Sequence, residues 1–255
     1  MRFSIITPTH KRSEKLQRAV ASVLRQTYRD FELIVINDSP DDTSYEPFEH
    51  SITDSRIRYL KNKKNMGLNY SRNRGLDEVS IYGEWVIFLD DDDYFAPDAL
   101  ATFKTLIEEH PNERWFVTNR AHIDGTPFTI VPKADTHYSY GIDVLLLKKF
   151  RGDATHCISK KELTSLRFSK RVRQAEEWIF YYELGTKIKF FYHDHNSTIS
   201  DGYTASGLNY RQRPRDERIH TLLLLLQDGL DRKLVYRPTF IAYAAARCIL
   251  LLKKN

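Results

Sequence analysis

The chain has 255 residues, 41% of them hydrophobic, which is enough to bury a sizeable core in one domain or in two tightly joined halves. Its net charge of +5 comes from the last 45 residues, which carry ten Lys or Arg and four Asp or Glu, and the nearly neutral remainder argues against a nucleic-acid-binding protein. Two cysteines are too few for a disulfide framework, so we expect a cytoplasmic protein with no nucleic-acid partner.

The first hundred residues alternate short apolar runs with helical patterns. The runs are too short and too rich in β-branched and aromatic residues for helices, so we predict strands at residues 3–7, 31–36, 56–60 and 85–89. Helical spacing of apolar residues and start signals predict helices at residues 13–24, after residue 67 and at 97–110. This alternation predicts an α/β fold with a mostly parallel, Rossmann-like sheet flanked by helices.

The rest of the chain is less regular. We predict strands at residues 115–120, 128–131, 156–159 and 187–192, and helices at 142–149 and 175–184. A tail follows with two helical stretches at residues 216–230 and 238–254. We therefore expect a domain over residues 1–210, with halves 1–100 and 101–210, and a basic helical tail over 211–255.

The second tail helix is apolar, with Arg247, Lys253 and Lys254 near its end. It is either an interfacial anchor to an anionic membrane surface or a helix that covers the core or forms a dimer, with a basic end favoured by the helix dipole. Both interpretations stay open.

Four consecutive aspartates, Asp90 to Asp93, follow the strand predicted at 85–89. Ligands of open α/β sheets bind in the crevice outside the carboxyl ends of the strands, and hard divalent cations take carboxylate ligands and often bridge them to phosphates. The alternative is a solvated acidic turn. An EF-hand loop fails because Tyr94 and Phe95 stand where it needs an oxygen ligand and a glycine. A dinucleotide fingerprint fails because no G-x-G-x-x-G follows the first strand.

Four motifs would meet at the same edge of a parallel sheet. They are TPTHKR after the first strand, INDSPDD after the second, GLNYSRNRG at the third helix, and DDDD. In this order they resemble the nucleotide-binding half of family 2 glycosyltransferases, which have a GT-A type domain, use a nucleotide-activated sugar and carry a metal-binding D-x-D motif. The resemblance covers about the first 100 residues well and continues more loosely to about residue 202. It implies that residues 1–100 bind the nucleotide and 101–210 the acceptor.

The resemblance implies a base pocket lined by Thr7, Pro8 and Thr9, with Asp38 accepting a hydrogen bond from the uracil or thymine imide. The family usually has two aspartates where this chain has Asn37 and Asp38. The alternative for Asp38 is a turn residue.

Arg72 matches the family's arginine at the start of the third helix, with Ser71 in place of the usual alanine. A guanidinium there can bind diphosphate oxygens in a bidentate manner. The alternative is a surface arginine, the role that we expect for Arg74.

In the acidic run, Asp90 and Asp92 form the D-x-D. The resemblance implies that Asp90 contacts the ribose or the metal, that Asp92 binds the metal, and that Asp91 or Asp93 positions the sugar. The expected cofactor is a divalent cation, Mn2+ or Mg2+. It would stabilise the departing diphosphate as a Lewis acid.

Inverting sugar transfer needs a base near the acceptor hydroxyl, and family members usually supply it from an E-D pair that opens a helix. Here the pair is Glu176 and Glu177, ahead of Trp178. We expect Glu177 to be the base, with Glu176 the alternative, and Trp178 to contact the acceptor. Acids in the first turn of a helix are also favoured by its dipole alone.

His195 lies in a segment similar to the family's H-x-x-S-x-S, with Thr198 and Ser200 at the hydroxyl positions. The resemblance places His195 at the metal or diphosphate, although a structural histidine is equally compatible. Asp153 and His156 are expected to contact the acceptor or the donor sugar.

We therefore expect an inverting, metal-dependent glycosyltransferase that uses a UDP-sugar, the commonest donor type in the family. The acceptor would be a saccharide or lipid-linked saccharide of a cell-surface polysaccharide or lipopolysaccharide, and the tail could contact the inner leaflet of the membrane. The alternatives are a catalytically silent nucleotide-sugar-binding scaffold and a nucleotidyltransferase. The latter normally has a Gly-rich basic loop after the first strand, and TPTHKR has no glycine.

Overall fold

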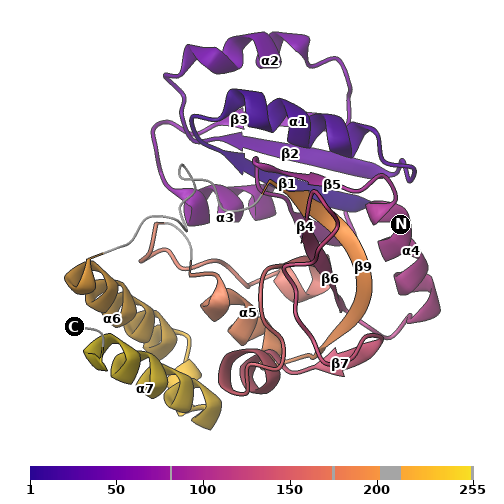
Figure 1. The fold of residues 1–255 in the computed structure, drawn as a ribbon. Coiled ribbons are helices and arrows are strands. Elements are labelled where there is room, and N and C mark those ends of the chain that lie inside the picture. The colour runs from indigo at the N-terminus through magenta and orange to yellow at the C-terminus, as the bar shows by residue number, and fades with distance from the viewer. Residues whose placement is uncertain (81, 174–175, 202–213, 254–255) are drawn as a thin grey trace.

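A computed structural model describes residues 1–80, 82–173, 176–201 and 214–253, with side chains up to residue 250. These residues form one curved sheet with helices on both faces (Figure 1). Its strands are β1 (Phe3–Thr9), β2 (Phe31–Asn37), β3 (Ile57–Lys61), β4 (Trp85–Phe88), β5 (Asp93–Phe95), β6 (Trp115–His122), β7 (Thr136–Tyr138), β8 (Ala154–Ser159) and β9 (Phe190–Ser200). They are arranged in the order β3-β2-β1-β4-β8-β6-β9-β5, and β7 also pairs with β9.

The first four strands are parallel, as the sequence predicts. Both β1 and β2 are buried along their whole length, which explains why they read as continuous apolar runs. Strand β1 continues past Pro8, and the Thr9 carbonyl accepts a hydrogen bond of 2.8 Å from the Asp38 backbone N–H. The carboxyl ends of β1, β2 and β4 therefore lie side by side.

The second half of the sheet is mixed. Strand β8 is antiparallel to β4 and β6, whereas β6 and β9 are parallel. Strand β5, which the sequence analysis missed, begins at Asp93 and pairs antiparallel with the end of β9. The strand predicted at 128–131 is wrong, because this segment forms only an isolated bridge between Ile130 and Arg151.

The helices are α1 (Ser13–Leu24), α2 (Glu46–Ser51), α3 (Leu68–Glu78), α4 (Ala99–Glu109), α5 (Trp178–Gly185), α6 (Arg215–Asp231) and α7 (Pro238–Lys253). Short 3-10 helices form at η1 (Thr43–Tyr45), η3 (Lys160–Leu163) and η4 (Leu234–Tyr236), and a π-helix forms at η2 (Tyr140–Leu146). Two buried clusters lie on opposite faces of the sheet. One includes residues of α1 and α4, and the other includes residues of α3, α5 and both tail helices.

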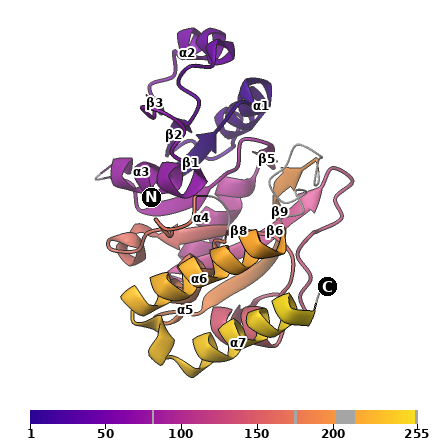
Figure 2. The same ribbon diagram turned by 90° about the vertical axis from the view of Figure 1, so that its left-hand side faces the viewer.

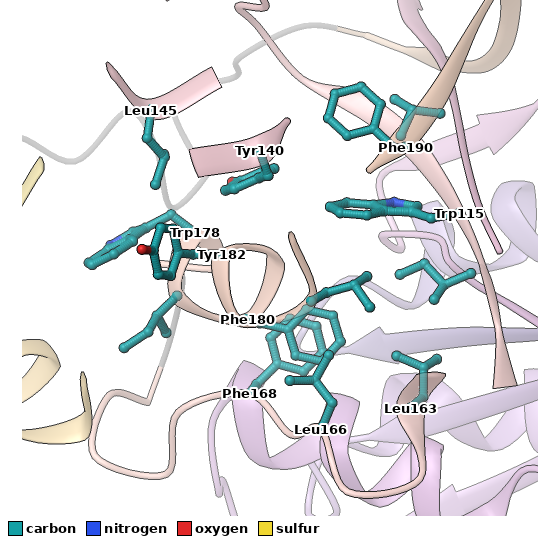
Figure 3. Packing of buried hydrophobic residues seen from close by; sticks show 14 of the residues in the cluster. Trp115, Tyr140, Leu145, Leu163, Leu166, Phe168, Trp178, Phe180, Tyr182 and Phe190 are labelled. Carbon is teal, nitrogen blue, oxygen red and sulfur yellow. The ribbon is translucent and has the colours of Figure 1, made fainter. Parts of the chain in front are cut away.

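The aromatic part of the second cluster surrounds α5. Phe168 and Phe180 stack with ring centroids 4.0 Å apart, and Trp115 lies 5.1 Å from Phe190 (Figure 3). Such ring pairs add to the stability that burial of their area already supplies.

The C-terminal tail packs on this cluster. Leu225 in α6 and Phe240 in α7 are fully buried, and the Phe240 ring lies 5.8 Å from Trp178 and 5.5 Å from Tyr182. Helices α6 and α7 lie against each other beside α5 (Figure 2). The tail thus covers the core with one face. Its proposed boundary at residue 210 and Lys254 lie outside the described residues.

Within the described chain, none of the helices has both the length and the apolar composition needed to cross a bilayer.

Candidate active site

The acidic run forms the turn between β4 and β5. Asp93 donates its backbone N–H to the carbonyl of Asp90, which folds the turn back on itself. Carboxylate oxygens of Asp90, Asp92 and Asp93 lie within 4.8 Å of one another. Three such oxygens suit a hard divalent cation. The residues of the predicted D-x-D are therefore together, and Asp93 joins them.

Asp91 points elsewhere. Its carboxylate accepts a hydrogen bond of 2.7 Å from the Thr9 hydroxyl and forms an ion pair of 2.7 Å with Arg12, which also pairs with Asp92. Burial raises the pKa of Asp91 to about 7, although Arg12 acts in the opposite direction. Thr9, Arg12 and Asp91 thus connect the end of β1 to the acidic turn.

Arg72 lies between the acidic turn and the predicted base. From α3, its guanidinium donates 2.9 Å to Asp90 and 2.6 Å to Glu177, and its side chain is almost fully buried over the ring of Phe168. Burial acts to raise the pKa of Asp90, but Arg72 and Arg120 outweigh it and hold that pKa below its ordinary value.

Arg120 on β6 also contacts the acidic turn, from a different element than Arg72. It donates 2.9 Å to Asp93 and 3.2 Å to Asp153, which lies just before β8. Burial raises the pKa of Asp93 to about 7, against the attraction of Arg120. Two arginines from different elements therefore hold the acidic turn in place.

A cavity of about 760 Å³ opens beside this turn. Asp90, Asp93, Arg72 and Arg120 line it, and Glu176 and Glu177 line it from the start of α5. The same walls carry aromatic rings, and the lining also includes Tyr140, Trp178 and Tyr181. A cavity of this size, in which charged side chains and aromatic rings converge, fits a polar small-molecule substrate. The cavity is thus lined both by the predicted base and by part of the predicted metal site.

The two glutamates of the pair differ in their contacts. Both oxygens of Glu176 are engaged, because Arg247 of α7 donates to them and Trp178 Nε1 adds a hydrogen bond of 3.0 Å. Within the described residues, the side chain of Glu177 accepts a hydrogen bond from Arg72 through Oε1 and has no other side-chain partner.

The sequence matches the family described as glycosyl transferase family 2 over residues 4–170, which is well over half of the chain. The chain belongs to glycosyl transferase family 2.

Among its relatives, the GalNAc(5)-diNAcBac-PP-undecaprenol beta-1,3-glucosyltransferase of Campylobacter jejuni is 41% identical over 103 residues, or 40% of this family 2 chain. The matched stretch covers 33% of that relative's length. The match thus covers less than half of this chain and about a third of that relative.

Solved structures with a similar fold include S. aureus TarS 1-349 in complex with UDP-GlcNAc, with a TM-score of 0.70 at 17% identity over 90% of this chain and 67% of that chain. The mannosyltransferase PcManGT from Pyrobaculum calidifontis, in complex with GDP-Man and Mn2+, has a TM-score of 0.60 at 14% identity over 100% of this chain and 76% of that chain. The likeness confirms the predicted α/β fold of GT-A type.

In the family 2 protein, the predicted base-pocket residues lie at the end of β1 and outside the cavity lining. Thr7, Pro8 and Thr9 are buried, and the Thr7 hydroxyl has no hydrogen-bond partner in the described residues. Asp38 accepts hydrogen bonds of 2.7 Å from Asn62 and from the backbone N–H groups of residues 66 and 67. Asp38 therefore fixes the loop before α3, whatever contact it makes with a nucleotide.

His195 is not brought to the acidic turn. Its ring nitrogens lie 2.9 Å from the Ser197 hydroxyl, 3.3 Å from an Asp98 oxygen and 3.4 Å from the Thr102 hydroxyl. The cause is its position on β9, beside the start of α4 and beyond the stretch that pairs with β5. His195 is therefore not positioned to share a metal ion with the acidic turn.

Sequence reasoning missed several residues around the cavity. Arg12 lies within the TPTHKR motif, so that motif was a usable signal. Arg120, Arg218 and Arg247 carried no motif, and only the folding of β6, α6 and α7 against the cavity brings them there. Arg74, expected at the surface, is half-buried and donates 2.7 Å to the Lys61 carbonyl.

His156, expected at the sugar or the acceptor, lines the cavity with a defined tautomer. The indole N–H of Trp115 can only donate, and it lies 3.1 Å from His156 Nδ1, so the proton of the neutral ring is on Nε2. The ring stacks on Tyr181 with centroids 4.1 Å apart. Burial lowers the pKa of His156 to about 3, so the side chain is a neutral donor at ordinary pH.

This protonation state predicts a pH dependence of stability. Between pH 6.5 and 3 the unfolded chain protonates His156 while the folded chain does not, so stability falls as the pH drops. Between pH 7 and pH 5, the free energy of unfolding should fall by roughly 1 to 2 kcal/mol more in wild type than in His156→Gln. Urea unfolding at both pH values measures this. His50→Gln, at an exposed position, is the control, and equal pH slopes in wild type and His156→Gln would contradict the assignment.

Gly152, next to Asp153 in the cavity wall, must be a glycine for two reasons. Its φ is +84°, and a Cβ there would lie 1.8 Å from the Phe128 carbonyl oxygen. Gly125 has a similar φ of +86° with nothing within 4 Å of its Cβ position, so it is a matched control. We expect Gly152→Ala to lower the free energy of unfolding by about 3 kcal/mol and Gly125→Ala by about 1 kcal/mol, as urea unfolding would show. Equal losses would mean that the backbone conformation alone matters.

Proposed function

We propose that this family 2 protein is an inverting, metal-dependent glycosyltransferase that moves a sugar from a UDP-sugar to a saccharide or lipid-linked saccharide acceptor. The observation that carries the proposal is the contact of Arg72 with both Asp90 and Glu177 in one cavity. In support, this contact joins the Glu177 carboxylate, which would act as the base, to the acidic turn, which would hold the metal. Belonging to family 2 gives the reaction class.

The nucleotide would lie against the end of β1, where Thr9, Asp38 and the acidic turn meet. In support, TarS, which shares the fold, has been solved with UDP-GlcNAc. Because PcManGT has the same fold and was solved with GDP-Man, the fold alone does not determine which nucleobase the donor carries. We propose UDP on the basis of Asp38, whose carboxylate could accept from an imide N–H.

In the proposed reaction Glu177 Oε2 takes the proton of an acceptor hydroxyl. The hydroxyl oxygen then attacks C1 of the donor sugar from the face opposite the leaving group, a new C–O bond forms, and the C1–O bond to the diphosphate breaks. The electron pair of that bond leaves with the nucleoside diphosphate, and the anomeric configuration inverts. Arg72 positions Glu177 for this role through its hydrogen bond to Oε1.

Asp90, Asp92 and Asp93 would hold the divalent cation, Mn2+ or Mg2+. Their oxygens are close enough to share one ion, and the three carboxylates are the ligand type that such ions prefer. When bound, the ion would supply Lewis-acid stabilisation of the leaving diphosphate. In support, PcManGT was solved with Mn2+.

Asp153, His156 and Trp178 would contact the acceptor or the donor sugar, because all three line the cavity. His156 can donate from Nε2 to a sugar oxygen. We further propose that the protein works at the cytoplasmic face of the membrane, with the exposed apolar side chains Leu223, Leu230 and Ile241 of the tail resting on the inner leaflet.

Calorimetric titration with UDP, GDP and their sugars, with and without Mn2+, tests the donor and the metal together. We expect one nucleotide class to bind only with the metal and to lose at least tenfold in affinity in Asp92→Ala. Formation of a product with inverted anomeric configuration then tests the reaction. Metal-independent binding without transfer would favour the silent scaffold, and absence of binding would leave the acidic run as a solvated turn.

A further inference from the structure

Among the described residues, the charged side chains of the cavity wall are paired with one exception. Arg72 pairs with Asp90 and Glu177, Arg120 with Asp93 and Asp153, and Arg247 with Glu176. Arg218 also lines the cavity. In the described part of the chain its side chain has no ion pair or hydrogen bond, and its Nε atom is buried. A guanidinium that is partly buried without an anion loses hydration and gains nothing in return.

Arg218 comes from the tail. It lies in the first turn of α6, and Thr221 of the same helix and Leu250 near the end of α7 line the cavity with it. The two helices are joined through η4 and run in opposite directions, so the start of α6 and the end of α7 lie at the same end of the pair (Figure 2). This end of the tail therefore forms part of the cavity wall.

We infer that Arg218 binds an anionic group of the acceptor, a phosphate or diphosphate ester that joins the acceptor saccharide to a lipid. This inference rests on the proposed function, since it concerns the acceptor of that reaction. The guanidinium fits phosphate oxygens in a bidentate manner. Thr221 can add a hydroxyl donor from one turn further along the same face of the helix.

Two features favour a phosphate on a lipid over a free anion. Leu250 lines the cavity and is nevertheless 62% exposed, and its neighbour Ile249 is 50% exposed, so an apolar surface continues outward from the cavity. A lipid chain attached to a phosphate at Arg218 could lie on this surface. The five cavity carboxylates that pair with the other arginines would repel an anion, so the tail wall is the favourable place for it.

Calorimetric titration of the full chain with geranyl phosphate, geraniol and inorganic phosphate tests this, each in the presence of UDP and Mn2+. We expect geranyl phosphate to bind best. Arg218→Gln should weaken it by on the order of tenfold, and the exposed Arg237→Gln, the same charge change at the opposite end of the helix pair, should leave it within twofold. Leu250→Gln should weaken geranyl phosphate and leave inorganic phosphate unchanged.

Other outcomes overturn the inference in distinct ways. If Arg218→Gln and Arg237→Gln lost affinity for geranyl phosphate equally, the binding would be a general charge attraction. If geraniol bound as well as geranyl phosphate, there would be no anion site. Inorganic phosphate as good as geranyl phosphate would overturn the lipid source. Binding of UDP with Mn2+ is measured separately in each variant. If wild type binds no nucleotide but does bind geranyl phosphate, the proposed function fails while the anion site stands.

Discussion

Glu177→Gln should lower the rate of sugar transfer by roughly 10³-fold without weakening the donor. Glutamine keeps the size of the side chain, and its amide oxygen can still accept the hydrogen bond from Arg72, so the geometry should persist. What it loses is the ability to take the acceptor proton. Single-turnover transfer rates measure the loss, and calorimetry with UDP and Mn2+ should give a dissociation constant within twofold of wild type.

Glu176→Gln is the matched control, since it makes the same change one residue earlier. Glu176 is already bound by Arg247 and Trp178, so its replacement should weaken the contact between α5 and α7 and reduce transfer less than tenfold. If Glu176→Gln stopped transfer while Glu177→Gln remained active, the two roles would have to be exchanged. Equal losses in both would point to a base outside the pair.

The first half of the fold could be predicted because its signals are local. Strands β1, β2 and β4 are buried on both faces, so their apolar runs stand out from the helices between them. The carboxyl ends of parallel strands meet at one edge, which brings Thr9, Asp38 and Asp90 together without further information. Arg72 and the glutamate pair were located by the resemblance to family 2, and the fold then brought Arg72 into contact with Glu177.

The missed features depend on contacts between segments far apart in sequence. Strand β5 has only three residues and exists because β9 is beside it. No local pattern shows that Arg12 will pair with Asp91, or that Arg120 will reach both Asp93 and Asp153. His195 was misplaced for the same reason, because its motif fixes its position along β9 and not the neighbour that its ring meets.

The tail shows the same limit. Its apolar and basic composition suits a membrane anchor, a dimer interface or a core-covering helix equally well. In the structure Phe240 is fully buried against α5, whereas Leu250 is exposed at the cavity. Both are apolar residues of one helix, and only the packing of α7 against Trp178 distinguishes them.

Arg72→Lys should reduce transfer by about 10²-fold with a small loss of stability. One guanidinium now reaches Asp90 and Glu177 with separate nitrogens, and a lysine ammonium is a single point charge that cannot reproduce both contacts. Asp90 and Glu177 remain about a third exposed, so water can solvate whichever carboxylate loses its partner. We therefore expect a loss of about 1 kcal/mol in urea unfolding and a far larger effect on transfer.

Arg74→Lys tests whether the loss of transfer depends on the contacts of Arg72 with Asp90 and Glu177 or on any change in α3. Arg74 lies two residues further along the same helix and donates to the Lys61 carbonyl and to Asn62, away from the cavity lining. It should change transfer by less than twofold. If Arg72→Lys left transfer intact while lowering stability, Arg72 would be a packing residue of the core and not the positioning residue for Glu177. A loss of transfer with normal stability, together with unchanged UDP binding, would show that the link between acidic turn and base acts on the reaction itself.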